Sequence, residues 1–472
     1  MSAHPVPMTP HQQGQALVLG MLVATLAATS LVVLYNLGQT VEARSRLTHA
    51  ADAAAYSGAL EQARALNGIA YINRSQIAHQ VAMAHLVTLG ASAQYIQALQ
   101  SQRNRANPPA GLIAMLFGPE MGLAYQTAHA PADAPVRLAR AFGQHDRIVH
   151  QVLEAAAREI VADLAASRDR IMRRVLAANY PDLAGIGLPD GTPSSPISLR
   201  LLADGWPGYT ERSPATRKAG LRPATEEAAG RYGFLGSRSQ TRRNSWMVNP
   251  RCPLHRHELR RRGSTWLGPD GRWGALDTQS YHALRSNRWI GCYYREYAMG
   301  WGTAQGEKSK APSDVEYVDE PPPDFSQEDF WRWVEHSTSW DIFSGATNPM
   351  ANSYAMASAQ RWPGGGLPAY REVVRARAGD PLRFAVAVSL DSAALKTTDS
   401  DSSVAAPAGV FRYAALGRSS AVAVSSAAET YFARPEPRTD GRSELATLFR
   451  PYWQARLSAV RPHEALQARG AP

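Results

Sequence analysis

The sequence of 472 residues contains few cysteines and few lysines, and each scarcity limits its interpretation. Only Cys252 and Cys292 are present, which excludes a dense disulfide framework. Lysine occurs only at positions 218, 308, 310 and 396. Arginine therefore supplies most of the positive charge in a chain whose formal net charge is +10. Abundant arginine and alanine together are typical of GC-rich coding. The positive charge alone therefore does not predict nucleic-acid binding, and we expect no nucleic-acid partner.

The motifs of common catalytic sites are also lacking. We find no nucleophile elbow, zinc-protease His-Glu-x-x-His motif, phosphate-binding glycine loop or dinucleotide fingerprint. The glycine run 364–366 lies between prolines without the Lys and hydroxyl residue of a phosphate loop, which predicts a turn. His79 and His85 have no paired acids, so we expect packing or surface roles. These absences predict a protein that is not an enzyme, with no cofactor, metal or small-molecule substrate.

One long uncharged run, ALVLGMLVATLAATSLVVLY, occupies residues 16–35. As a helix rising 1.5 Å per residue, it spans a hydrocarbon core of about 30 Å. A cleaved secretory signal would carry Lys or Arg before its apolar core, and residues 1–15 contain neither. The run is also long for a signal, and no small-x-small cleavage site follows it. We therefore predict a retained transmembrane helix after a short cytoplasmic N-terminus, residues 1–15.

The orientation of this helix cannot be taken from charge alone. Arg44 and Arg46 follow the span while no Lys or Arg precedes it, and this count by itself predicts a cytoplasmic body. We nevertheless expect the body outside the cytoplasm. The preceding flank is short and polar, no second span returns the chain, and the family resemblance described below implies this orientation.

Small residues recur every four positions within the span, at Ala16, Gly20, Ala24 and Ala28. Such a stripe lets a second helix approach closely in lipid, where packing drives association. Frequent Ala and Gly in this composition explain the same pattern, so both interpretations stay open.

Helical patterns continue beyond the span. Residues 39–100 contain no proline, are rich in alanine and place apolar residues near helical spacing, which predicts that the membrane helix continues into a long extracytoplasmic helix. Gly68 and Gly90 indicate breaks or close packing. A second helical block is predicted over 136–179, closed by the Tyr-Pro pair at 180 and 181.

The composition changes near residue 182 to Gly, Pro, Trp and Tyr with short apolar runs. The runs at 272–278, 291–301 and 383–391 predict short antiparallel strands. Residues 303–324 are polar and rich in proline, which predicts a flexible linker. The expected fold class is α+β. After the span come a helical region (36–181), an α+β region (182–302), the linker and a C-terminal α+β region (325–472).

Two segments resemble a known family. The sequence QGQALVLGMLVATLAATSLVVLYNLGQ at 13–39, followed by RLTHAADAAAYSGALEQARALNGIAYINRSQIAHQVA at 46–82, is similar to the TadE/TadG-like family of the tight-adherence (Flp) pilus machinery. The stretch ETYFARPEPRTDGRSELATLFRPYWQARL at 429–457 resembles the end of longer members. The resemblance implies a pilin-like or pilus-assembly subunit in the bacterial inner membrane, with its body periplasmic or at the cell surface.

The chain departs from two features of such proteins. Prepilin processing would cut after Gly14, but Leu19 stands where pilin-like substrates commonly carry Glu. Some larger members hold a metal in an Asp-x-Ser-x-Ser motif. Here Ala393 and Leu395 replace both hydroxyl residues after Asp391, and the later acidic stretch at 399–403 follows a polar segment.

The two cysteines allow two interpretations. With His255 and His257 they could supply four zinc ligands, although the spacing is irregular for a zinc module. In an oxidising compartment a disulfide between Cys252 and Cys292 is favoured, closing a loop of about forty residues worth roughly 3 to 4 kcal/mol.

Eight arginines lie between Arg238 and Arg262, interleaved with Trp246 and two histidines. They could bind phosphate, teichoic or lipopolysaccharide anions, or nucleic acid, or they could form a solvated face. We therefore expect a membrane-anchored pilus-assembly or minor pilin-like protein that contacts other pilus or secretion-system subunits. The alternative is a membrane-tethered module that binds an anionic envelope polymer.

Overall fold

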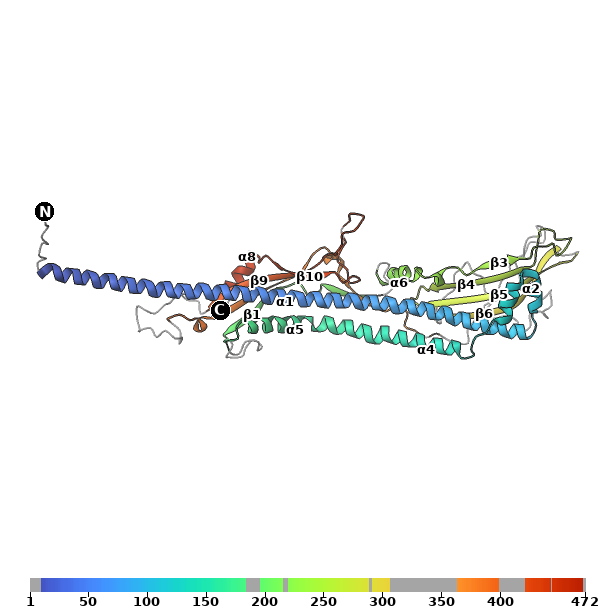
Figure 1. Cartoon of the computed structure of the whole chain (residues 1–472), viewed down its shortest axis with the longest axis horizontal. Helices are drawn as coiled ribbons and strands as arrows, with labels where there is room; N and C mark the ends of the chain where they lie inside the picture. Colours follow the sequence, from blue (N-terminus) through green and yellow to red (C-terminus); the bar gives the residue numbers. More distant parts are fainter. Residues whose placement is uncertain are drawn as a thin grey trace, which may run out of the picture. The chain divides into compact units, whose positions relative to one another are not determined.

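The computed structural model describes residues 10–183, 196–214, 220–287, 291–305, 362, 364–398, 421–442 and 444–469. Helices and antiparallel sheets share the chain, in agreement with the α+β expectation at that level (Figure 1). The chain divides into two compact units, each built from separated segments. The first unit comprises residues 1–71, 159–211 and 372–472, and the second comprises 72–158 and 212–371.

The helix α1 (Pro10–Asn104) contributes to both units and runs for 95 residues without interruption. The predicted continuation of the membrane helix is therefore present, and neither Gly68 nor Gly90 breaks it. Gly90 is instead a point of close packing, because a Cβ there would lie 2.2 Å from the Trp362 ring. The second helical block is present as α4 (Ala134–Arg147), a π-helical turn (Ile148–Leu153) and α5 (Glu154–Asn179).

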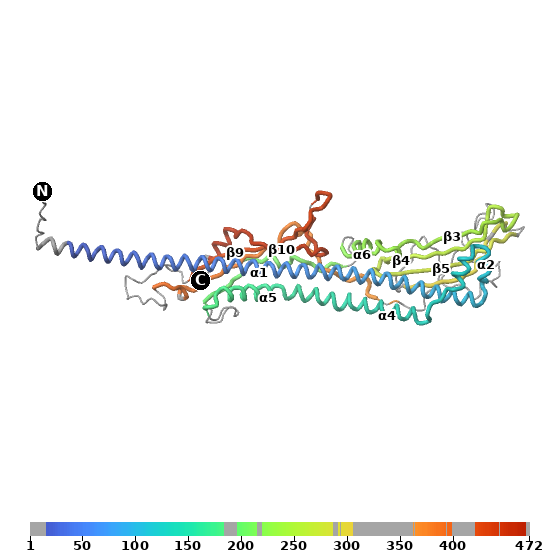
Figure 2. The backbone as a smooth tube through the Cα atoms, in the orientation of Figure 1, coloured from blue at the N-terminus to red at the C-terminus, as the bar shows by residue number. Residues whose placement is uncertain are grey.

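The first unit packs α1 and α5 against one four-stranded antiparallel sheet of order β1-β8-β9-β10. These strands are β1 (Ile197–Asp204), β8 (Leu382–Asp391), β9 (Ala421–Phe432) and β10 (Trp453–Ser458), followed by the helix α8 (Pro462–Arg469). Short 3-10 turns lie at Arg375–Arg377 and Ser392–Ala394. The helices run along the sheet in the tube view (Figure 2).

Alanine allows the helix to approach this sheet closely. Ala51, Ala54, Ala55 and Ala59 on α1 are fully buried against a core that includes Phe384 on β8. Their small side chains, spaced three or four residues apart, form one continuous face of the helix. A Cβ at Gly58 would lie 2.9 Å from the Phe384 ring, so this position also needs a minimal side chain.

The second unit contains an antiparallel meander of order β3-β4-β5-β6. Its strands are β3 (Gln240–Arg243), β4 (Glu258–Leu267), β5 (Trp273–Asn287) and β6 (Gly291–Gln305). Its other elements are α2 (Ala110–Phe117), α3 (Pro119–Thr127), α6 (Leu221–Gly230) and a 3-10 turn at Gly233–Leu235. Two short strands, β2 (Thr210–Ser213) and β7 (Tyr370–Val373), pair with each other, and the division between the two units falls within each of them.

The expectation of short strands is wrong for β5 and β6, which are each 15 residues long. Polar residues in these strands are paired across the sheet and do not end it, as described below. The predicted linker 303–324 is also corrected at its start, because Thr303, Ala304 and Gln305 belong to β6. The rest of that range lies outside the described residues. The consecutive regions predicted from composition differ from the interleaved units, because α1 and α5 each pass through both.

Candidate functional site: the exposed apolar end of α1

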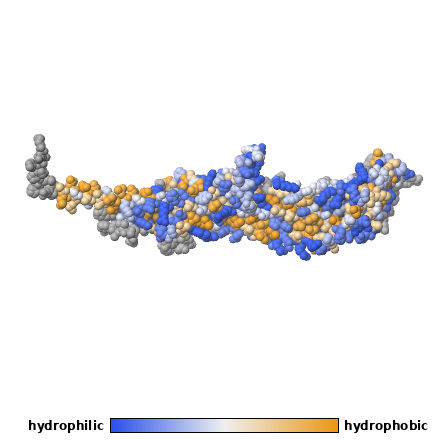
Figure 3. Space-filling view, in the orientation of Figure 1, coloured by the Kyte–Doolittle hydropathy of each residue, from blue (hydrophilic) through white to orange (hydrophobic). Residues whose placement is uncertain are grey.

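The N-terminal part of α1 exposes a large apolar surface. Leu17 and Leu26 are each 67% exposed, and the leucines and valines between them are similarly accessible. None of the most apolar 18-residue stretch of the helix is buried. Figure 3 shows hydrophobic residues concentrated along this segment. A contiguous surface of this kind requires lipid or another protein to cover it.

Among the described residues this is the one helix long and apolar enough to cross a membrane. A signal sequence near the N-terminus has the same properties, so the segment is compatible with an anchor and with a secretion signal.

The polar side chains inside this segment satisfy their hydrogen bonds within the helix. The hydroxyl of Thr25 donates to the Met21 carbonyl, that of Thr29 to the Thr25 carbonyl at 2.6 Å, and that of Ser30 to the Leu26 carbonyl at 2.8 Å. Hydrocarbon offers no water to such groups, so internal bonding removes most of their cost of insertion.

Asn36 marks the point where the body begins to cover the helix. It is fully buried, and its side-chain amide donates to the Val32 carbonyl at 2.9 Å and to the Thr398 hydroxyl at 2.8 Å. Its side-chain oxygen accepts the Thr398 N–H at 2.8 Å. Beside it, the Tyr35 hydroxyl donates to the Lys396 carbonyl at 3.2 Å. These bonds attach the segment after β8 to the end of the apolar run.

Sequence reasoning did not identify this attachment. Its available signal was that Asn36 is the first residue after the run 16–35 and carries an amide. Its partner Thr398 lies 362 positions away, so no local pattern could have supplied it.

The predicted helix-packing residues Ala16, Gly20, Ala24 and Ala28 are all exposed on this segment. A Cβ built at Gly20 would meet no atom within 4 Å. The stripe therefore makes no close contact within the chain at that position, and its role in packing against another helix stays a prediction.

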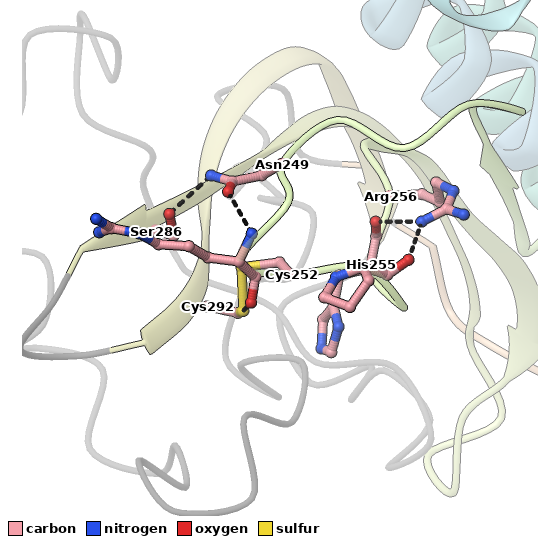
Figure 4. Close-up of a disulfide and its surroundings, with 8 residues drawn as sticks. Asn249, Cys252, His255, Arg256, Ser286 and Cys292 are labelled. Carbon is pink, nitrogen blue, oxygen red and sulfur yellow. Dashed lines mark hydrogen bonds between the residues drawn. A yellow bond between two sulfur atoms is a disulfide. The ribbon is translucent and has the colours of Figure 1, made fainter.

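Cys252 and Cys292 form a disulfide with their sulfurs 2.11 Å apart and their Cα atoms 5.9 Å apart (Figure 4). The bond joins the loop between β3 and β4 to the start of β6. Asn249 supports this loop with two hydrogen bonds. Its side-chain amide donates to the Ser286 hydroxyl at 2.7 Å, and its backbone carbonyl accepts the Cys252 N–H at 2.9 Å.

A four-ligand zinc site does not fit this arrangement, since the disulfide uses both sulfurs. His257 Nδ1 accepts the Leu284 N–H at 2.9 Å, and burial followed by the charge of Arg285 lowers the pKa of His257 to about 4. No group of three or more His, Cys, Asp and Glu side chains that could hold a metal lies within the described ranges. In the segment compared with the Asp-x-Ser-x-Ser metal motif, which starts at Asp391, Leu395 is buried in the hydrophobic core. The later acidic stretch 399–403 lies outside the described residues.

Arginines of the segment 238–262 stabilise the sheet of the second unit. Arg238 and Arg261 both pair with the buried Asp277 on β5, at 3.0 and 3.1 Å. Arg238 also donates to the carbonyl oxygens of Phe234 and Ser264. This side chain therefore binds several parts of the unit and is not a free surface cation.

A second carboxylate, Glu258 on β4, is paired in the same way. Arg243 and Arg260 each lie 2.8 Å from its oxygens, and Glu258 is 2% exposed. Four of the eight arginines thus neutralise buried carboxylates. The interpretation as a solvated face is corrected for Arg238, Arg260 and Arg261, whose side chains are at most 25% exposed. Arg243 is 67% exposed and stays accessible to solvent while it pairs with Glu258.

A buried polar cluster on the same sheet lacks the geometry of a catalytic triad. The Ser280 hydroxyl lies 2.8 Å from His282 Nε2, and Glu296 Oε1 lies 3.5 Å from the same nitrogen. A relay needs the nucleophile and the acid on opposite ring nitrogens. His282 Nδ1 has no hydrogen-bond partner among the described residues. All three residues are at most 1% exposed, so substrate cannot reach them in this conformation.

No protein-family model, curated protein or solved structure matches the chain. The functional interpretation therefore depends on the site geometry and on the resemblance of its motifs.

Proposed function

We propose that this chain is a single-pass protein of the bacterial inner membrane, with its bulk periplasmic or extracellular, that acts as an assembly or minor pilin-like subunit of a Flp/Tad-type pilus. The observation that carries the proposal is the division of α1. Its first part exposes an unbroken apolar surface, and from Asn36 onward the body covers one face of the same helix. One uninterrupted helix thus connects a lipid-compatible segment to a folded domain.

The proposed action is helix packing and protein–protein contact, without catalysis, cofactor or small-molecule substrate. The exposed small residues on the anchor support contact with another helix in lipid. The motifs at 13–39 and 46–82 support the choice of pilus machinery, since they resemble the TadE/TadG-like family. The alternative, a binding module for an anionic polymer, has less support because four arginines of the segment 238–262 already pair with buried carboxylates.

The experiment is to delete the gene in the bacterium that encodes it and to count pili by electron microscopy. We expect pili to be lost and to return with the full-length protein, which should also co-purify with other pilus components after crosslinking. A matched variant replaces residues 16–35 with an unrelated transmembrane helix that lacks small residues. It should insert and fold but restore few pili. Normal piliation in the deletion strain would refute the proposal.

A further inference from the structure

A small cavity in the second unit collects more positive charge than the described residues around it neutralise. The cavity has a volume of about 110 Å³ and lies between α1, the start of α5 and the paired strands β2 and β7. Arg158, Arg212 and Arg371 line it, and Glu154 is the one carboxylate among its lining residues. All of these residues belong to the second unit.

Glu154 neutralises only one of the three arginines. Its Oε1 lies 2.5 Å from a guanidinium nitrogen of Arg212. Arg158 and Arg371 form no ion pair with any residue that the structure describes. Arg212 and Arg371 stand on paired strands, where like charges destabilise the pairing. Burial, and then the positive charges of Arg212 and Arg158, lower the pKa of Arg371. An anion in the cavity would remove this repulsion.

The cavity also contains a buried acceptor without a donor. Gln76 on α1 is 1% exposed, and its side-chain nitrogen donates to the Ala369 carbonyl at 3.2 Å. Its side-chain oxygen has no hydrogen-bond partner among the described residues. The neighbouring Asn73 donates to the Arg371 carbonyl at 2.8 Å, which attaches β7 to the same face of α1. A buried acceptor of this kind is costly unless a donor reaches it.

We propose that this cavity binds a small tetrahedral oxyanion that carries a proton, with inorganic phosphate as the best fit. Arg158 and Arg371 would bind the anionic oxygens, because guanidinium groups match phosphate oxygens in geometry and charge. The side-chain oxygen of Gln76 would accept the P–OH hydrogen bond. None of these three residues takes part in the proposed contact between membrane helices, so this site goes beyond the proposed function.

The proton makes the proposal selective. Inorganic phosphate keeps at least one proton at neutral pH, whereas sulfate has none to donate to Gln76. A phosphate monoester, such as the headgroup of a lipid or sugar phosphate, has lost most of its second proton at pH 7, since its second pKa is about 6. We therefore expect phosphate to bind more tightly than sulfate, and glycerol 3-phosphate to approach phosphate only below about pH 6.

The test uses calorimetric titration of the full-length protein in detergent, at pH 7 and constant ionic strength, with phosphate, sulfate and glycerol 3-phosphate in turn. One phosphate should bind per chain, at least tenfold more tightly than sulfate. Arg371→Gln should weaken phosphate binding at least tenfold, while Arg231→Gln, an exposed control directly after α6, should leave it unchanged.

Gln76→Met tests the acceptor, because it keeps the size of the side chain and should bring phosphate affinity down to that of sulfate. If burial makes that variant unstable, Arg158→Gln at an exposed position provides the second variant and should also weaken binding. Absence of phosphate binding, equal binding of phosphate and sulfate, or full affinity in Arg371→Gln would each overturn the proposal. Tight binding of glycerol 3-phosphate at pH 7 would also overturn it, in favour of a monoester site.

Discussion

Gly90 on α1 illustrates how one missing side chain sets a packing distance. A Cβ at this position would lie 2.2 Å from the indole of Trp362, which is 1% exposed. Proximity in sequence gives no indication of this contact, although a glycine inside a helical pattern does indicate either a break or close packing.

We predict that Gly90→Ala lowers the free energy of unfolding by about 1–3 kcal/mol, because overpacking exceeds the gain in helix propensity. Gly143→Ala in α4 is the matched control, since its Cβ would meet nothing within 4 Å. The control should raise stability by about 0.5–1 kcal/mol. Urea denaturation measures both variants, and stabilisation of both would show that Trp362 does not limit the approach at Gly90.

The buried Glu296 gives a second prediction at this scale. Burial raises its pKa from 4.5 to about 8, opposed by the Ser280 hydrogen bond and by Arg260 and Arg262. Between pH 4.5 and about 8, Glu296 is ionised in the unfolded chain but protonated in the folded protein. The free energy of unfolding therefore decreases as the pH rises through this range. Glu296→Gln removes this dependence.

The Gln variant should therefore gain stability relative to the unaltered protein on going from pH 5 to pH 8. Burial also lowers the pKa of His282, which makes the free energy of unfolding depend on pH at acid pH. Both proteins contain His282, so this dependence largely cancels when the Gln variant is compared with the unaltered protein. The exposed Glu227→Gln serves as control and should show no such trend. A constant difference across this pH range would mean that Glu296 is ionised in the fold.

The helices were predictable from the sequence to a degree that the strands were not. The continuation of α1 follows from the absence of proline and from regular apolar spacing, both of which are local signals. In β5, by contrast, the predicted strand 272–278 stops where Gln279, Ser280 and His282 begin. These polar residues remain in the sheet because their partners come from β4 and β6, and no local pattern contains that information.

The disulfide was predictable because the chain has only two cysteines. Replacing both Cys252 and Cys292 with Ser should lower the free energy of unfolding by about 3–4 kcal/mol, the chain-entropy value for a loop of this length. Thiol labelling of the unreduced, denatured protein should find no free thiol. Stoichiometric labelling of both cysteines in protein purified without reductant would show that the bond does not form.

The anchor's stripe of small residues leads to a prediction at the scale of the helix. Gly20→Leu should leave membrane insertion intact, because Leu is at least as apolar, but should reduce crosslinking to a partner helix by keeping the backbones apart. Met21→Leu, one position further along, is the control and should change little. If Gly20→Leu crosslinks and supports piliation as well as the unaltered protein, the stripe reflects composition alone.

At the scale of the whole molecule, the order of the chain differs from the order of its units. The sheet of the first unit pairs β1 with β8, although the strands of the second unit lie between them in sequence. Composition can show where strands begin but not which distant strands pair. The sequence therefore predicted regions that follow one another along the chain, whereas each unit in the structure is built from separated segments. The apolar run of the candidate site was evident from sequence, and its attachment through Asn36 was not.

The central claim is that a single retained helix holds a body outside the cytoplasm, and reporter fusions after Pro472 test it most directly. A fusion to alkaline phosphatase, active only outside the cytoplasm, should be active, and a fusion to a reporter active only in the cytoplasm should be silent. The full-length fusion should remain in carbonate-washed membranes. An active cytoplasmic reporter would contradict the orientation, and release of the active phosphatase fusion as a soluble protein would contradict the anchor.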